Sequence, residues 1–322
     1  MRADGLRGGS LRRSRAGFTL VEILAALAIL AIALTAVFAT FTSQQKSFTV
    51  QNRVAEMQQN LRQAVEHMTR DIRMAGYGLP DNVTIPTNVV AAGVTSLRSL
   101  YAKDNTTGPD QIYILYLFDM DANQPPTVNS VAMTGTGSVN VASTTGFLPA
   151  GGELVLITDN VTADLFMTSA AAGGVLTFGG GSSYNSGHAK LYGIGPPPAT
   201  VAKARFVRYY IDSTTDAAHP TLMVDRMGGD TPQPVADDME DLQLTYGLDT
   251  NADGMVDTWT PTPANLSQVR QVRLQILART RVPETGWREI RPALGNRAAG
   301  ATADGYRRRA IDVVIDVRNS GA

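Results

Sequence analysis

A long apolar run near the N-terminus is the strongest pattern in the chain. Between Phe18 and Gln45 the only charged side chain is Glu22, and the charge-free stretch 23–45 that follows it holds 23 residues. About 20 apolar residues in a helix are enough to cross the hydrocarbon core of a bilayer. The run therefore predicts one membrane-spanning helix over 18–45.

Basic residues gather in front of this run. The five arginines that precede it are Arg2, Arg7, Arg12, Arg13 and Arg15. Positive flanks remain on the cytoplasmic side of a membrane helix, so we expect a cytoplasmic N-terminus and an external remainder of the chain. A cleaved secretory signal is the alternative, but no small-x-small cleavage site with a helix break follows the run.

After the apolar run the pattern becomes one-sided. Between positions 46 and 78, apolar residues recur at alternating spacings of three and four: Val54, Met57, Leu61, Ala64 or Val65, Met68, Ile72 and Ala75. This spacing gives a helix one apolar face. No proline occurs between Phe18 and Leu79, so a single helix can continue to Gly76. We expect its apolar stripe to pack on a globular head; a coiled-coil stalk would show the same periodicity.

Beyond position 78 the pattern changes to strands separated by glycine-rich turns. The predicted strands are 111–118, 135–142, 153–158, 165–168, 175–178, 204–211, 221–226, 239–248, 268–281 and 309–318, and 193–200 reads as a linker or crossover. The predicted fold class is α+β, a long N-terminal helix packed on a β-rich head. The predicted organisation is a leader at 1–17, a membrane helix at 18–45, its amphipathic continuation at 46–78 and an extracytoplasmic head at 79–322.

Composition narrows the classes of function. The chain has 28 Lys and Arg against 29 Asp and Glu, a balance that argues against a nucleic-acid partner. It has no cysteine, which excludes disulfides, thiolate metal sites and thiol nucleophiles. No phosphate-binding loop, zinc-protease motif or nucleophile elbow occurs in it. The sequence therefore predicts a protein that is not an enzyme.

One acidic loop has the spacing of a calcium site. The pattern D-x-N-x-D-G-x-x-D places oxygen ligands at alternate positions around a glycine that permits a sharp turn. The candidate ligands are Asp249, Asn251, Asp253, Met255 through its carbonyl, and Asp257. The acids at 237, 238, 240 and 241 would add negative charge that favours a cation. Thr260 stands where an EF-hand has its bidentate glutamate, and an ordinary Asp-Asn-Gly turn explains the same residues.

The junction before the apolar run carries a compact motif. The segment from Arg15 to Glu22 reads R-A-G-F-T-L-V-E, a basic stretch ending in Gly17, then Phe18, then a glutamate four residues later. This motif resembles the prepilin family, in which the glutamate is the fifth residue of the mature chain. This resemblance implies that prepilin peptidase cuts between Gly17 and Phe18 and methylates the new amine. A carboxylate inside a membrane helix costs about 2.5 to 3.5 kcal/mol on insertion scales, so Glu22 is expected to serve in assembly.

Several head segments share motifs with a known family: 152–159 with 163–166, 241–249, 269–274, and 306–309 with 317–319. In these segments the chain resembles the minor-pilin family PilW, which is related to the J-type pseudopilins of secretion systems. Asn160 stands where many relatives carry cysteine. The 17-residue leader and the absence of proline from the apolar helix differ from the commonest major pilins.

The resemblance implies a minor pilin that primes a type IV pilus or is incorporated into it. Its expected partners are prepilin peptidase, other minor and major pilins, and the inner membrane. We expect the head in the periplasm first and on the pilus or cell surface later. The residues separate this reading poorly from a pseudopilin of type II secretion. A membrane-anchored ligand-binding module that merely uses the prepilin pathway is the third alternative.

Overall fold

The structure is a computed structural model that describes residues 17–80, 83–84, 99–118, 128–129, 133, 137–159, 161–185, 190–193 and 199–317. The leader arginines, Asn160 and most of the expected linker at 193–200 lie outside these residues. The chain forms two compact units, Met1–Asn52 and Arg53–Ala322. Their common boundary falls inside one helix.

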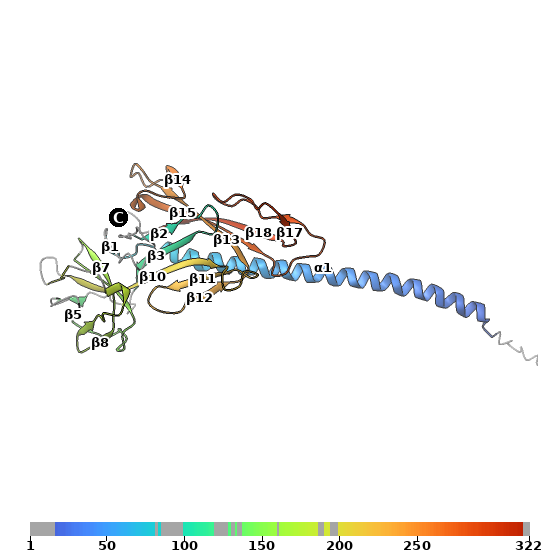
Figure 1. Cartoon of the computed structure of the whole chain (residues 1–322), viewed down its shortest axis with the longest axis horizontal. Coiled ribbons are helices and arrows are strands. Elements are labelled where there is room, and N and C mark those ends of the chain that lie inside the picture. The colour runs from blue at the N-terminus through green and yellow to red at the C-terminus, as the bar shows by residue number, and fades with distance from the viewer. Residues whose placement is uncertain are drawn as a thin grey trace, which may run out of the picture. The chain divides into compact units, whose positions relative to one another are not determined.

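Helix α1 (Leu20–Met74) has 55 residues, as the uninterrupted pattern predicted (Figure 1). Thr19 precedes it, and its carbonyl and hydroxyl both accept the N–H of Glu22, at 3.1 and 3.3 Å. Side-chain acceptors of this kind satisfy N–H groups that the first turn leaves without partners. The helix is followed by a turn at 75–78, where Gly76 takes a φ of +79°, a left-handed conformation that suits glycine.

The part of α1 in the first unit is apolar and uncovered. By length and composition this helix could cross a membrane, and none of its most apolar window is buried by the residues that the structure describes. Leu20, Leu27 and Phe38 are among the large side chains that are more than half exposed. In water such a surface would be unfavourable, so it calls for lipid or other helices.

The part of α1 in the second unit is amphipathic and buried on one face. The buried apolar residues are Met57, Leu61, Ala64, Met68, Ile72 and, just past the helix, Ala75. Val54 and Val65 pack against the same cluster. The prediction that this stripe lies on a globular head is confirmed.

Two β-sheets supply the other sides of that cluster. A nine-stranded sheet has the path β1 (Val83–Thr84), β7 (Ala163–Met167), β6 (Leu154–Thr158), β10 (Thr200–Asp212), β11 (Thr221–Arg226) and β12 (Gln233–Ala236). Strands β3 (Gln111–Leu117) and β4 (Val128–Asn129) pair with β10, and β2 (Leu100–Lys103) pairs with β3. A four-stranded sheet has the order β14 (Thr258–Thr260), β13 (Met239–Leu248), β15 (Val269–Arg279) and β18 (Arg308–Asp316). One apolar cluster joins the stripe of α1 to residues from both sheets.

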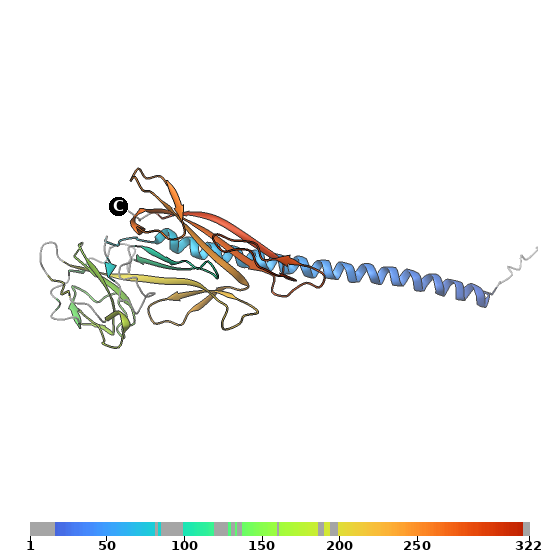
Figure 2. The ribbon, with the colours of Figure 1, turned by 45° about the horizontal axis from the view of Figure 1, so that its top comes forward.

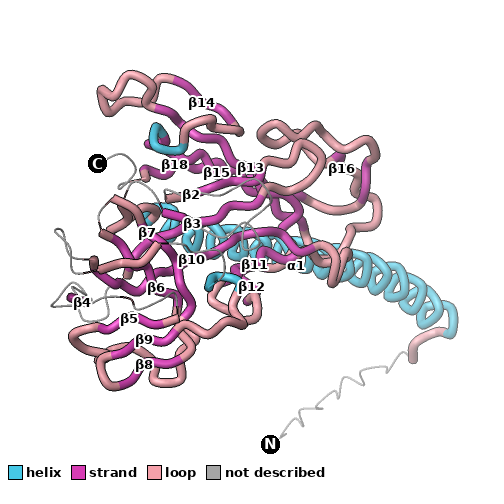
Figure 3. The backbone as a smooth tube through the Cα atoms, turned by 60° about the vertical axis from the view of Figure 1, so that its left-hand side comes forward, coloured by secondary structure: helices cyan, strands magenta, loops and turns pink. Residues whose placement is uncertain are grey.

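The remaining strands form smaller pieces. Strands β5 (Ser138–Asn140), β9 (Val175–Thr177) and β8 (Ala170–Ala172) make a three-stranded sheet (Figure 3) with an apolar cluster shared with β6, β7 and β10. Strands β16 (Glu289–Ile290) and β17 (Ala303–Asp304) pair with each other. Two short 3₁₀ turns, at Ser183–Asn185 and Leu266–Gln268, complete the described elements.

Most of the predicted strands are present, with ends shifted by a few residues. The predicted strands 204–211 and 221–226 form a hairpin, because β10 and β11 pair antiparallel from Val207 with Arg226 to Asp212 with Thr221. The strands missed by the pattern are short ones such as β8, which consists of three alanines, and β12, which contains Pro234. Such strands form because a neighbouring strand is there to pair with them.

Candidate functional site

The three residues of the predicted processing and assembly motif lie together at the start of α1. Phe18 is 80% exposed, Glu22 is exposed, and the space around Gly17 is open, since no atom beyond its immediate chain neighbours lies within 4 Å of the position a Cβ would take. Within the described residues the Glu22 carboxylate makes no hydrogen bond or ion pair. Its negative charge in the first helical turn is favourable to the helix dipole. The motif is therefore open to a partner.

A second carboxylate of α1 lies in the head and is fully engaged. Asp71 is buried between the helix and the nine-stranded sheet. Its two oxygens accept hydrogen bonds from the hydroxyls of Tyr209, at 2.6 Å, and Tyr116, at 3.0 Å. Nδ1 of His67, one turn earlier, lies 2.8 Å from the Tyr209 hydroxyl. Since that hydroxyl donates its proton to Asp71, His67 is the donor in this contact.

The two tyrosines remain protonated donors. Burial, followed by the nearby charge of Asp71, raises the pKa of Tyr116 to about 12 and raises the pKa of Tyr209 further. The sequence reasoning missed this contact. A signal was present, because Asp71 lies three residues after Met68 and four before Ala75, within the apolar stripe. A carboxylate at such a position needs hydrogen-bond donors.

The predicted calcium loop lies between β13 and β14, and its carboxylates bond to the chain itself. Asp249 is buried and accepts hydrogen bonds from the N–H of Gly254 at 3.0 Å and from Nε of Arg270 at 3.1 Å. Asp257 accepts from both the N–H and the hydroxyl of Thr250, each at 2.7 Å, and these bonds lower the pKa of Asp257.

The other proposed ligands are engaged in the same way. The Asn251 amide donates to Asp253 at 3.1 Å and to Asp257 at 3.3 Å, and Asp253 accepts the N–H of Met255 at 2.8 Å. Among the residues that the structure describes, no group of three acidic or histidine side chains is arranged to hold a metal ion. A guanidinium at Asp249 competes with a cation there, and calcium binding stays a prediction.

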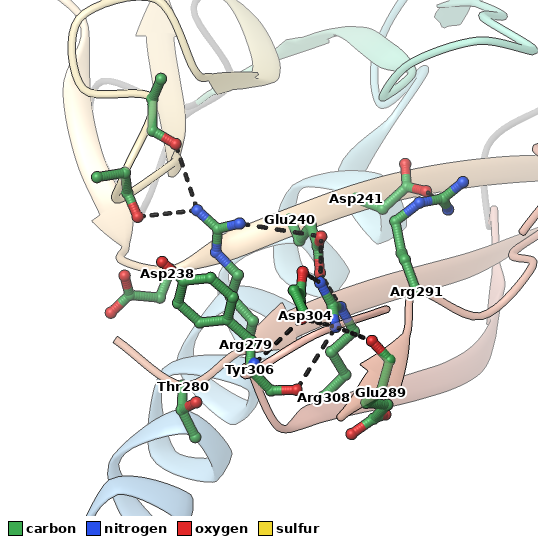
Figure 4. A network of polar contacts seen from close by, with 12 residues as sticks. Asp238, Glu240, Asp241, Arg279, Thr280, Glu289, Arg291, Asp304, Tyr306 and Arg308 are labelled. Atoms are coloured by element: carbon green, nitrogen blue, oxygen red, sulfur yellow. Dashed lines mark hydrogen bonds and ion pairs between the residues drawn. The ribbon is translucent and has the colours of Figure 1, made fainter. Parts of the chain in front are cut away.

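The acidic residues at 237–241 pair with arginines and do not support a calcium site. Asp238 contacts His219 and Arg281, and Asp241 contacts Arg291 and Arg297. Figure 4 shows the part of this network around Arg308. The expectation that these acids raise the negative charge near the loop is wrong, because cationic side chains distant in sequence neutralise them.

Arg308 is the centre of that network. Its side chain is 2% exposed and binds two carboxylates, Glu240 at 2.6 and 3.0 Å and Asp304 at 2.7 and 2.5 Å. It thereby joins β18 to β13 and to β17. Arg307 pairs with Glu284 at 2.6 Å and lies over the ring of Trp287. Two of the three consecutive arginines are thus used inside the chain, and only Arg309 among them is exposed.

Comparisons with known families agree with the two motifs. Residues 12–38 match the family model described as the prokaryotic N-terminal methylation motif. Residues 208–319 match the family model described as type IV pilus-assembly protein W, PilW. The first match defines the class, a membrane-anchored pilin whose leader is processed by prepilin peptidase and whose partners are other pilins. Together the two matches support a type IV pilus minor pilin whose C-terminal part, residues 208–319, is similar to the PilW family.

A comparison of structures gives one further likeness. A type IV-like pilin from Thermus thermophilus has 13% sequence identity and a TM-score of 0.39, over 82% of this chain and 96% of that chain. Among proteins with curated functions, none matches the chain.

Proposed function

We propose that this minor pilin works purely by assembly, through lateral packing of its N-terminal helix and contacts of its head, without catalysis. The observation that carries the proposal is the contrast along α1. From Met57 onward its apolar face is covered by the head, whereas the apolar side chains around Leu27 have no cover within the chain. A surface of that kind must be covered by lipid and then by other helices.

Processing would precede assembly. Prepilin peptidase would cut between Gly17 and Phe18 on the cytoplasmic side and methylate the new amine. The head would stand in the periplasm and reach the pilus with the rest of the chain. The exposed backbone around Gly17 supports cleavage at this place, since a peptidase needs an accessible peptide bond.

Glu22 would set the register of the packed helices. It lies four residues after Phe18, about 6 Å deeper along the axis at 1.5 Å per residue. In a staggered filament its carboxylate can meet the amine of an adjacent subunit. The low dielectric strengthens such a pair and makes any packing that leaves the charge unpaired costly.

The test combines two variants with fractionation, N-terminal sequencing and a pilus-assembly assay. Glu22→Ala should insert and be cleaved after Gly17 but fail to enter the pilus. Gly17→Leu should insert and keep its leader, and it should fail because five arginines cannot enter an apolar bundle. Thr40→Val, a neutral change in the same helix, is the control and should assemble. Normal piliation by the uncleaved Gly17→Leu chain, with no other minor pilin present, would overturn the proposal.

A further inference from the structure

Strand β18 is an open edge of the four-stranded sheet (Figure 2). Its nine residues pair with β15 alone within the described chain. Other edge strands of the two large sheets are short or interrupted: β12 carries Pro234 and a register shift, β2 has four residues, and β14 has three. Proteins usually shorten or interrupt such edges, because a long unpaired strand templates the addition of another.

Two hydrogen bonds at the ends of β18 show which backbone groups point outward. Val317 donates its N–H to Arg270 O at 2.8 Å, and Thr280 donates to Arg307 O at 2.9 Å. Hydrogen-bonded pairs alternate along an antiparallel ladder, so the odd-numbered residues between them bond to β15. The residues of β18 whose N–H and C=O are directed away from β15 are Arg308, Ala310, Asp312, Val314 and Asp316.

The side chains on the sheet face that meets the helix are also incompletely covered. Ile315 is buried, but Ile311 and Val313, on the same face, are only partly buried although they pack on the main apolar cluster. On the opposite face Val314 is 49% exposed. A strand added beside β18 would cover these residues and satisfy the outward backbone groups together.

The charge of Arg309 indicates that the strand added to β18 comes from a different subunit and not from a second copy of this chain. Arg309 shares the face of Ile311 and Val313, is exposed, and forms no ion pair with the described residues. Residues opposite each other in an antiparallel pair point to the same face. On that face β18 carries only Arg309, Ile311, Val313 and Ile315, so a second β18 cannot offer a carboxylate to Arg309.

We propose that β18 is completed by an edge strand from the head of a different pilin subunit, with apolar residues opposite Ile311 and Val313 and a carboxylate beside Arg309. Main-chain hydrogen bonds would supply the attraction and the side chains the selectivity, as in other strand additions. The inference rests on the proposed function in taking the partner to be a pilin.

The experiment places a photo-crosslinking phenylalanine derivative at Ala310 in the full-length chain, in cells that make pili. Irradiation should join the chain to another pilin, and mass spectrometry should locate the link in an edge strand of that pilin. The same derivative at Leu148, which is exposed in the loop between β5 and β6, should not give this product. Because crosslinking requires only contact between two subunits, the readout does not depend on a finished pilus.

Proline separates strand addition from ordinary contact. Val314→Pro removes an N–H directed to the open side, which an edge strand tolerates, so the chain should fold and be cleaved while the crosslinked product falls at least tenfold. Val314→Thr keeps the N–H and should crosslink normally. Val313→Pro removes an N–H directed to β15 and should lower the melting temperature.

Three results would overturn the inference: no product, a product with a second copy of this chain, or an equal yield from the proline and threonine variants. Failure of the proposed function shows itself separately, as normal piliation by Gly17→Leu.

Discussion

The two parts of α1 make an instructive comparison, because each carries one carboxylate in an apolar setting. Glu22 is exposed and makes no bond to the described chain, whereas Asp71 is buried and accepts two tyrosine hydroxyls. One element thus treats the same chemical group in opposite ways. The head satisfies its own buried charge, whereas the N-terminal part leaves its charge without a partner among the described residues.

The largest effect should come from placing a new carboxylate in each part. Leu61→Asp puts an unpaired charge at a position with no exposure and should unfold the head or destabilise it by several kcal/mol. Leu27→Asp should leave the melting temperature of the head unchanged, since Leu27 is exposed in the first unit. Thermal unfolding of both full-length chains in detergent makes the comparison. Equal melting temperatures would show that the stripe around Leu61 is free in the monomer.

Removing the native carboxylates should give a smaller difference of the same kind. Asp71→Ala leaves two buried tyrosine hydroxyls without an acceptor, at about 1 to 3 kcal/mol for each unsatisfied group. Asp71→Asn keeps an acceptor and should lose less. Glu22→Ala should melt like the wild type and differ only in assembly. Denaturant unfolding in detergent measures the free energy of unfolding of all three variants. A loss of stability in Glu22→Ala would contradict the difference between Asp71 and Glu22.

The stability of the head should also depend on pH, and this dependence comes from Asp110 in the head and not from the N-terminal part of α1. Asp110 is buried, and burial raises its pKa from 3.8 to about 7, although the N–H groups of Asn105 and Leu244 oppose the shift. The folded state therefore binds this proton more tightly than the unfolded state. Its contribution to stability is full below about pH 4, falls as the pH rises to about 7, and is constant above that. Melting temperatures should decline over this window, and Asp110→Asn should flatten the profile.

The smallest expected effect is that of calcium. If the loop at Asp249 binds calcium with a dissociation constant near 1 mM, 5 mM calcium would stabilise the head by about 1 kcal/mol, or roughly 2 to 4 °C. Magnesium is the matched control, and Asp253→Asn should remove the shift. An identical melting curve with and without calcium would leave the loop an ordinary turn in which Arg270 already occupies the place of a cation.

The local pattern predicted α1 well and its polar contacts poorly. Periodicity identified the stripe through Leu61 and Met68, because helical spacing is a property of neighbouring residues. It did not identify the donors to Asp71, because Tyr116 and Tyr209 follow it by 45 and 138 residues and meet it only through the register of the sheet. The acids at 237–241 were misjudged for the same reason, since their arginine partners come from distant segments.

The motif at Gly17, Phe18 and Glu22 was read from the sequence without help from the fold. It is linear, and its chemistry depends on spacing along one helix. The position of each residue in the structure is compatible with that interpretation, and the partner of Glu22 stays a prediction.

Arg308 determines which side chains strand β18 exposes at the edge of its sheet. Its guanidinium can bind both Glu240 and Asp304 in only one register of β18, so these contacts fix the register of the strand. A slip of one residue would turn every side chain to the opposite face, burying Asp312 and directing Ile311 and Val313 to water. One buried arginine therefore determines which residues are exposed at this edge of the sheet, although Arg308 itself does not have to contact another subunit.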